Sequence, residues 1–485
     1  MLNAIRRSSS STSADAPTTA VRVDRSSAFQ TTWTVFWVAF AVRVLYMTLA
    51  HTYRIRPAED HFQFGWEMGR IARALVTGYG YADPFSGHTG PTTWVVPLYP
   101  LLLAGVFKFF GVYTPASAWV ILTINSFFSA LTALTTYEIA ARCYGRRVAL
   151  WSAWIWALYP AAMQYSVRWV WEMTLSTWLL SWVVVLALRM RGTGESSSQE
   201  NAETKGSVAN WAMQRSESHG AAGQTSSLRR WLLFGFVWSL IALSNPSLLL
   251  FLPAAGIWVI MGQPRSALRR QLAYASASAV LFVMCISPWV IRNALVFHRF
   301  IPMRANFGAE FYMGNGPGAR GFLMEYNHPF QSARQLELYR SMGEVAYAQM
   351  RGRIAWKIVQ HDPGLFARNT IKRIYFFWIS VPHPANDAWY VEVGRVANFS
   401  FVSVAGLLGL ALAIRRHKPA AWLFAWAFLL LPLIYYFVTV HARFRNPLEP
   451  LITVLGVYLF QSAERKARRS GSAGPELACD AVHQT

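Results

Sequence analysis

Two adjacent carboxylates, Glu59 and Asp60, stand just beyond the first long apolar run of the chain. That run, residues 33–50, has the length and composition of a membrane-spanning helix. The acids would therefore lie close to the point where the chain leaves the membrane, where charged groups are costly and usually functional. A carboxylate in this place could be the general base of a transfer reaction whose donor is a lipid. The alternative is that the pair only solvates a loop.

Three arginines stand where a cation needs an anionic or polar partner. Arg43 lies inside the first apolar run, so it must reach outward or pair with an anion in a cavity. Arg443 and Arg445 precede the last apolar run. The guanidinium fork matches phosphate oxygens. Anchoring to lipid headgroups is the alternative for this second pair.

Three further polar residues are predicted to line a substrate cavity. His61 directly follows the acidic pair, and Tyr99 gives a polar tip to an apolar segment. Glu172 is the acid at the start of the fourth apolar run, so it either faces a polar cavity or pairs with Arg168. No His/Cys metal spacing, GxSxG elbow or Walker loop occurs, and no metal site is predicted from spacing.

Two segments of the first outer loop would position these groups. Residues 64–75 carry apolar side chains at helical spacing with Arg70 and Arg73 offset from them, which indicates an amphipathic helix on the membrane face. Residues 94–110 form an apolar run interrupted by Pro97 and Pro100. Each proline removes a helix hydrogen bond that lipid cannot replace, so we expect an interfacial or re-entrant helix here.

The composition is that of a membrane protein. Of 485 residues 54% are hydrophobic and only 14% are charged, whereas soluble proteins have about a quarter charged. The net charge of +22 comes largely from residues between apolar runs, so we interpret it as topological and expect no nucleic-acid partner. Cys143, Cys285 and Cys479 are dispersed and predict no disulfide framework.

Apolar runs predict an all-α polytopic protein with about ten transmembrane helices. The runs are residues 33–50, 117–141, 148–165, 171–188, 231–243, 247–261, 271–290, 396–414, 420–440 and 451–462. With the N-terminus inside and 94–110 not crossing, the Lys/Arg clusters near 146, 189–230, 265–270, 415–418 and 465–469 all fall inside. This topology leaves interfacial helices and an extracytoplasmic loop domain outside.

The chain divides into seven predicted parts. These are a flexible cytoplasmic tail (1–32), an N-terminal membrane module (33–190) with a catalytic outer loop (51–115), a disordered cytoplasmic loop (191–230), membrane helices (231–291), an extracytoplasmic domain (292–395), C-terminal membrane helices (396–462) and a cytoplasmic tail (463–485). The loop at 191–230 is rich in Ser, Gly and Gln, a composition that cannot support a core.

Taken together, these features resemble the GT-C-type membrane glycosyltransferases, which include the protein O-mannosyltransferases and the lipid A aminoarabinose transferases. The resemblance covers most of the chain except the tails and the Ser-rich loop. It is carried by Glu59-Asp60, residues 71–78, 97–100 with 109–111, Glu172, residues 288–293 with 306–315, and residues 442–450.

The resemblance implies an integral membrane enzyme that moves a sugar from a polyprenyl-phosphate donor to a lipid, glycan or protein acceptor, with inversion. It implies Asp60 as the catalytic base with Glu59 as rival, because the family's Asp-Glu order followed by tyrosine is here Glu-Asp followed by His61. It also implies that Arg443, Arg445 and Arg43 contact the donor phosphate. No cofactor is firmly implied, although Glu59, Asp60 and Glu172 could share a divalent cation.

Two other classes fit part of the pattern. A lipid or solute transporter or flippase would also have many spans and charges within the membrane, but the sequence shows no internal repeat. A non-catalytic scaffold of envelope assembly is the other. We expect a multi-pass protein of the cell inner (plasma) membrane whose active site is on the extracytoplasmic side, in contact with membrane lipids.

Overall fold

The computed structural model describes residues 31–55, 64–194, 226–322, 325–381 and 389–471, with side chains up to 464. Glu59, Asp60 and His61 lie outside the described residues. Within these ranges the chain is helical, and its β-pairing is one isolated bridge between Ala82 and Pro91. The predicted all-α class is therefore confirmed.

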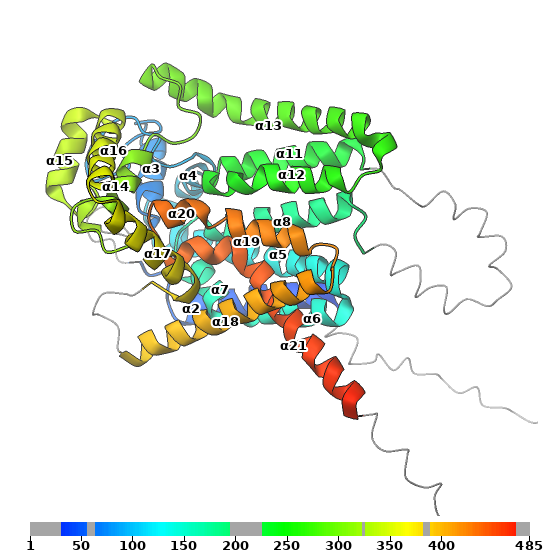
Figure 1. The fold of residues 1–485 in the computed structure, drawn as a ribbon. Helices are drawn as coiled ribbons and strands as arrows, with labels where there is room; N and C mark the ends of the chain where they lie inside the picture. The colour runs from blue at the N-terminus through cyan, green and yellow to red at the C-terminus, as the bar shows by residue number, and fades with distance from the viewer. Residues whose placement is uncertain (1–30, 56–63, 195–225, 323–324, 382–388, 472–485) are drawn as a thin grey trace, which may run out of the picture.

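The elements follow one another as shown in Figure 1. They are α2 (Thr32–Leu49), α3 (Glu67–Val76), α4 (Leu98–Phe110), α5 (Pro115–Tyr144), α6 (Arg146–Leu158), α7 (Pro160–Val167), α8 (Met173–Met190), α11 (Leu228–Ala242), η2 (Pro246–Phe251), α12 (Leu252–Met261), η3 (Arg265–Ala267), α13 (Leu268–Phe297), α14 (Phe307–Asn315), η4 (Glu325–Asn327), α15 (Ala333–Met342), α16 (Glu344–His361), α17 (Pro363–Ile379), α18 (Trp389–Arg415), α19 (Ala421–Leu430), α20 (Leu433–Phe437), η5 (Ala442–Leu448) and α21 (Glu449–Gly471).

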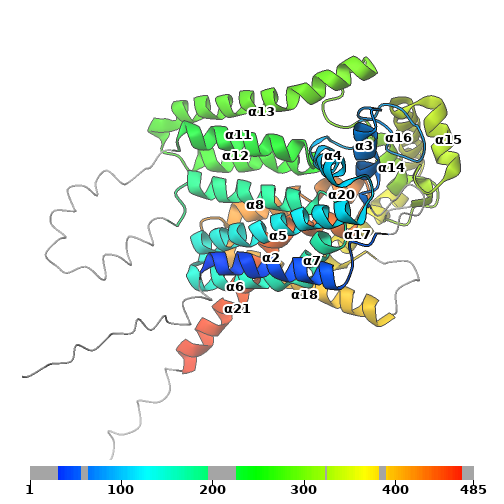
Figure 2. The ribbon, with the colours of Figure 1, turned by 180° about the vertical axis from the view of Figure 1, so that it is seen from behind.

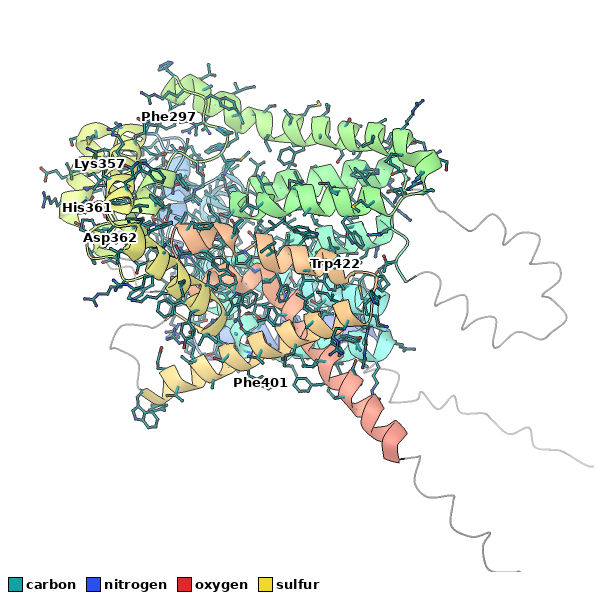
Figure 3. All side chains as sticks on the ribbon, viewed as in Figure 1. Phe297, Lys357, His361, Asp362, Phe401 and Trp422 are labelled. Atoms are coloured by element: carbon teal, nitrogen blue, oxygen red, sulfur yellow. The ribbon has the colours of Figure 1, made fainter. Side chains whose placement is uncertain are left out.

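Long apolar helices run side by side and form a bundle (Figures 1 and 2). Helix α5 packs against α2, α6 and α8, helix α11 joins α8 to α13, and α18 packs against α21. Phe401 and Trp422 lie on the outside of this bundle (Figure 3) and are 62% and 61% exposed. Large apolar side chains on the outside of an apolar bundle are expected where lipid is the solvent.

Five of the described helices are long and apolar enough to cross a membrane. They are Thr32–Leu49, Pro115–Tyr144, Met173–Met190, Arg265–Phe297 and Trp389–Arg415, and shorter apolar helices cover Leu98–Phe110, Pro246–Met261 and Ala421–Phe437. The chain is thus a multi-pass membrane protein, while the number of about ten spans stays a prediction. The segment predicted to be interfacial or re-entrant is the 13-residue helix α4.

The five helices α3, α14, α15, α16 and α17 gather at one end of the bundle (Figures 1 and 2). Phe297, Lys357 and His361 lie at this end (Figure 3). Helix α3 is the helix predicted in the first outer loop, although its Arg70 is buried, and its place on the membrane face stays a prediction. The end domain formed by α14–α17 comes from the long segment that we predicted to be a separate outer domain.

The loop before α4 is held between the bundle and the end domain. Arg292, near the end of α13, donates to the carbonyl oxygens of Thr92 at 2.7 Å and Tyr81 at 2.8 Å. From the other side, the buried carboxylate of Glu344 accepts from Thr93 N at 2.8 Å, from Thr93 Oγ1 at 2.6 Å and from Thr92 Oγ1. Three donors of two adjacent loop residues converge on this one buried carboxyl group, so it fixes the loop firmly.

Basic loops gather at the opposite end of the bundle. Glu138 of α5 accepts from Arg142 at 2.7 Å and from Arg189, near the end of α8, at 3.1 Å. Arg230, in the first turn of α11, donates to the Arg189 carbonyl oxygen at 3.1 Å. The positive clusters that follow α5 and α8 and precede α11 therefore share one end, as the topological interpretation of the charge requires.

Candidate functional site

A cavity of about 590 Å³ lies where the end domain meets the bundle. Its wall combines apolar residues with polar and charged ones that come from separate parts of the chain. They include Trp66, Glu67, Trp94, Glu172, Asn245, Leu249, Leu250, Pro253, Arg304, Phe307, Glu310, His328, Phe330, Tyr435, Arg443 and Phe444. Pockets of this size with a few convergent polar groups are typical ligand sites.

Two carboxylates enter the cavity at helix N-termini. Glu67 is the first residue of α3, and Glu172 is the N-cap residue of α8. A helix N-terminus carries partial positive charge and stabilises an anion placed there. Burial raises the pKa of both carboxyls above the usual range, and Arg443 opposes that shift in both. Carboxyl groups that share a cavity and have shifted pKa values are typical of functional sites.

A strained turn places Glu67 at the start of α3. Trp66 has φ 55° and ψ −125°, which is unfavourable for a residue with a side chain. It follows Gly65, whose φ is 92° and where an added Cβ would lie 2.9 Å from the Val170 carbonyl oxygen. Such outliers persist where the surrounding structure fixes them, and they concentrate at functional sites.

Arg443 brings positive charge to the same cavity. Its guanidinium carbon lies 4.3 Å from the ring centroid of Trp171, which stacks the cation on the residue before Glu172. Within the described residues its guanidinium donates to no side chain or carbonyl group. The neighbouring Asn446 ties this segment to α8 through Thr177 Oγ1, at 2.7 Å. Among the residues that the structure describes, Arg443 is therefore a positioned cation whose donors are unoccupied.

A second charged group forms the wall on the side of the end domain. Arg304 donates through Nε to the Trp94 carbonyl oxygen at 2.7 Å and through Nη2 to Glu310 Oε1 at 3.3 Å. Asn306 also donates to Glu310 Oε1, at 3.0 Å. These contacts balance the negative charge of Glu310. We therefore assign Arg304, Asn306 and Glu310 mainly to holding α14 against the loop at Trp94.

Arg43 is buried inside the bundle and does not line the cavity. It donates to the carbonyl oxygens of Ala39 at 3.0 Å, Ala157 at 2.7 Å and Trp156 at 3.2 Å, and to Ser129 Oγ at 3.1 Å. The Ala157 and Trp156 carbonyls belong to the last turn of α6, which ends before Pro160. Two of its four partners are thus orphan carbonyl oxygens of a broken helix.

Arg445 and Tyr99 also lie away from the cavity wall. Arg445 pairs with Glu449 at 2.5 Å and donates to Ser403 Oγ at 2.5 Å, with both members of the ion pair buried. The Tyr99 hydroxyl is buried and exchanges hydrogen bonds with the amide of Asn125 at 3.0–3.1 Å. These contacts are structural, and of the three predicted phosphate ligands only Arg443 reaches the cavity.

Glu172 faces the cavity and does not pair with Arg168, whose guanidinium instead lies 5.9 Å from the Trp169 ring centroid. This resolves the alternative that the sequence left open. Glu59, Asp60 and His61 lie outside the described residues, so their roles stay predictions. For the same reason the carboxylate set proposed for a divalent cation has one described member, Glu172, and no group of three potential ligands gathers elsewhere in the described ranges.

Of the acidic, basic and histidine residues in the cavity wall, four were not predicted: Glu67, Arg304, Glu310 and His328. A signal existed for Glu67, because it is an acid at the start of a helix in the same outer loop as Asp60. The other three come from the end domain and its approach, where no periodic pattern marks a residue as facing a cavity.

The fold, but not the sequence, resembles known proteins. No family model matches the chain, and no curated protein matches it. The apo oligosaccharyltransferase of Archaeoglobus fulgidus superposes with a TM-score of 0.52 at 12% identity, over 91% of this chain and 52% of that one. ArnT from Cupriavidus metallidurans bound to undecaprenyl phosphate gives 0.33 at 13% identity, over 92% and 81%.

The likeness to the archaeal enzyme is one of fold, and it confirms the predicted GT-C-like architecture. The chain spans about half the length of that oligosaccharyltransferase. Activity, substrates and partners therefore rest on the cavity and its chemistry.

Proposed function

We propose that this chain is an integral membrane glycosyltransferase that moves a sugar from a polyprenyl-phosphate-linked donor to a lipid, glycan or protein acceptor. The observation that carries the proposal is the meeting of Arg443, whose donors no described residue occupies, with two carboxylates in one cavity. A phosphate leaving group needs a cation to stabilise its charge. The carboxylates could accept the proton of the attacking nucleophile or a hydrogen bond from a sugar hydroxyl group. The shared fold supports the proposal.

The mixed lining of the cavity suits a lipid-linked donor. Leu249, Leu250 and Pro253 line it on the side of the bundle, and Phe307 on the side of the end domain. Leu250 and Phe307 are 41% and 59% exposed, so the apolar wall continues to the outer surface of the protein. A prenyl chain in the bilayer could follow this wall while its phosphate and sugar reach the polar part.

In the proposed mechanism Asp60, with Glu59 as rival, removes the proton from an acceptor hydroxyl or amine. The nucleophile attacks the anomeric carbon in line, the bond from that carbon to the phosphate oxygen breaks, and the configuration inverts. The polyprenyl phosphate leaves with the electron pair, and Arg443 stabilises its growing charge. The proposal places the protein in the inner membrane with the cavity on the extracytoplasmic side.

The first test is transfer by purified protein in lipid nanodiscs with radiolabelled undecaprenyl-phosphate sugars and a membrane extract as acceptor source. We expect the wild type to consume a donor, and Asp60→Asn to lose at least about 100-fold in rate because general-base catalysis contributes about 10²–10⁴-fold. Asp24→Asn, in the predicted cytoplasmic tail, is the matched control. Full activity in Asp60→Asn with loss in Glu59→Gln would move the base to Glu59, and full activity in both would refute this mechanism.

A further inference from the structure

Glu67 and His328 form a pair on the cavity wall that the proposed mechanism does not use. Glu67 Oε1 lies 3.4 Å from His328 Nε2, and their side chains are 15% and 10% exposed. Both residues line the cavity. One comes from α3 and the other from the segment between η4 and α15, so the pair joins the first outer loop to the end domain across the cavity.

The hydrogen bonds of His328 determine which of its nitrogens carries the proton. The backbone N–H of Phe330 donates to His328 Nδ1 at 3.1 Å, so Nδ1 is the acceptor. Burial lowers the pKa of His328 to about 4, which leaves the imidazole neutral at physiological pH. A neutral imidazole has one N–H, and here it must be on Nε2, the atom that faces Glu67.

The N–H of His328 therefore faces Glu67 across 3.4 Å, and the imidazole has no lone pair left for a substrate. Burial raises the pKa of Glu67, and the positive charges of Arg443, Arg70 and Arg304 oppose that shift and favour the ionised form. The negative charge of Glu67 in turn raises the pKa of Glu172. Within the described part of the chain no side-chain hydrogen bond occupies the Glu67 carboxylate, and His328 Nε2 is its ion-pair contact. An ionised carboxylate has about four lone-pair positions, so Glu67 retains acceptor capacity at the cavity wall.

We propose that Glu67 accepts a hydrogen bond from a substrate hydroxyl group, and that His328 is the neutral donor that orients Glu67 and keeps it ionised. The inference rests on the proposed function, because a sugar donor and its acceptor are the hydroxyl-bearing molecules that this cavity would bind. Glu67 is then a substrate-binding residue and His328 a positioning residue.

The kinetic test compares Glu67→Gln with the charge-matched control Glu337→Gln on the exposed face of α15, using the undecaprenyl-phosphate sugar that the wild type consumes. Loss of a charge-assisted hydrogen bond should raise one KM by about 10- to 100-fold and change kcat little. A higher KM for the sugar donor would show that the hydroxyl group bound by Glu67 is on the sugar. A higher KM for the acceptor would show that it is on the acceptor. Glu67→Asp, which keeps the charge, should show a smaller rise and replaces the amide variant if that variant does not insert.

A pH profile separates positioning from a merely structural role. Activity should fall in acid as Glu67 is protonated. His328→Leu removes a donor to the ionised carboxylate, which raises the pKa of Glu67 and moves the acid limb of kcat/KM to higher pH. His328→Gln keeps an N–H donor and should leave the limb near its original position. His361→Gln, on the exposed end of α16, is the control. Glu67→Gln should lose the acid limb of the kcat/KM profile that Glu67 causes.

The outcomes distinguish this inference from the function beneath it. A wild type that consumes no polyprenyl-phosphate sugar refutes the proposed function, and the inference with it. A wild type that does so, with both KM values unchanged in Glu67→Gln or an acid limb unmoved in His328→Leu, refutes the inference alone.

Discussion

Two arginines of the same short helix have different environments. Arg443 and Arg445 both belong to η5, a 3₁₀-helix, in which three residues complete a turn and positions two apart face different directions. Arg443 therefore reaches the cavity, whereas Arg445 points into the protein toward Glu449 and Ser403. The sequence places both arginines at the same depth and does not distinguish their roles. The 3₁₀ geometry of η5 and the position of α18, which carries Ser403, do distinguish them.

The contrast predicts opposite phenotypes. Arg443→Ala should raise the KM for the donor by about 10- to 100-fold, because charge-assisted hydrogen bonds to phosphate contribute about 1.5–3 kcal/mol. Its thermal unfolding should match that of the wild type. Arg445→Ala leaves Glu449 buried without its partner and should destabilise the protein by about 3–5 kcal/mol. Donor titrations and thermal unfolding in detergent measure the two effects, with the exposed Arg334→Ala as control. An Arg443→Ala variant that unfolds early would make that arginine structural.

At the scale of elements, most of the helices could be predicted and their interruptions could not. The run at 148–165 was predicted as one span, but it divides into α6 and α7 because Pro160 has no N–H to continue the ladder. The run at 420–440 divides in the same way, as α19 ends at Leu430 and α20 follows Pro432. The argument that we applied to Pro97 and Pro100 applies equally to these prolines.

The glycine-rich segment at 314–318 is partly helical. Gly314 and Asn315 form the last residues of α14, where Arg373 of α17 donates to the Gly314 carbonyl oxygen and, at 2.8 Å, to Asn315 Oδ1. A Cβ at Gly314 would lie 1.8 Å from the Val438 carbonyl oxygen. The glycine thus permits α14 to approach the segment that carries Val438 and Thr439 in the cavity wall.

We therefore expect Gly314→Ala to destabilise the protein by about 1–3 kcal/mol, as overpacking of a filled site does. Transfer should fall as well, because the displaced backbone lines the cavity. Gly105→Ala in α4 is the matched control, since nothing lies within 4 Å of its added Cβ. That variant should be neutral or slightly more stable, as alanine is the better helix former. Thermal unfolding of the pair measures the difference, and equal stabilities would refute the close-packing argument.

At the scale of the whole molecule, the sequence predicted where charge is concentrated but not which residues meet. Glu172 and Arg443 were predicted as site residues, and the fold brings both to one cavity. Tyr99 and Arg43 were predicted for the same reasons of depth and polarity, yet their partners lie inside the bundle. Hydropathy reports how deep a residue lies. The direction in which it points depends on the tertiary packing, and His328 joins the site through tertiary packing alone.

The two ends of the bundle differ in a way that fixes the expected orientation. The cavity and the end domain lie at one end, and the basic loops that include Arg142, Arg189 and Arg230 lie at the other. Short basic loops remain in the cytoplasm, so the cavity should face outward. Single cysteines at the exposed positions Ser341 on α15 and Ser266 in η3, in a chain whose own three cysteines are replaced, test this. A membrane-impermeant maleimide applied to intact cells should label Ser341→Cys, and Ser266→Cys only after lysis. Labelling of both before lysis, or the reverse order, would place the cavity away from the compartment that the mechanism requires.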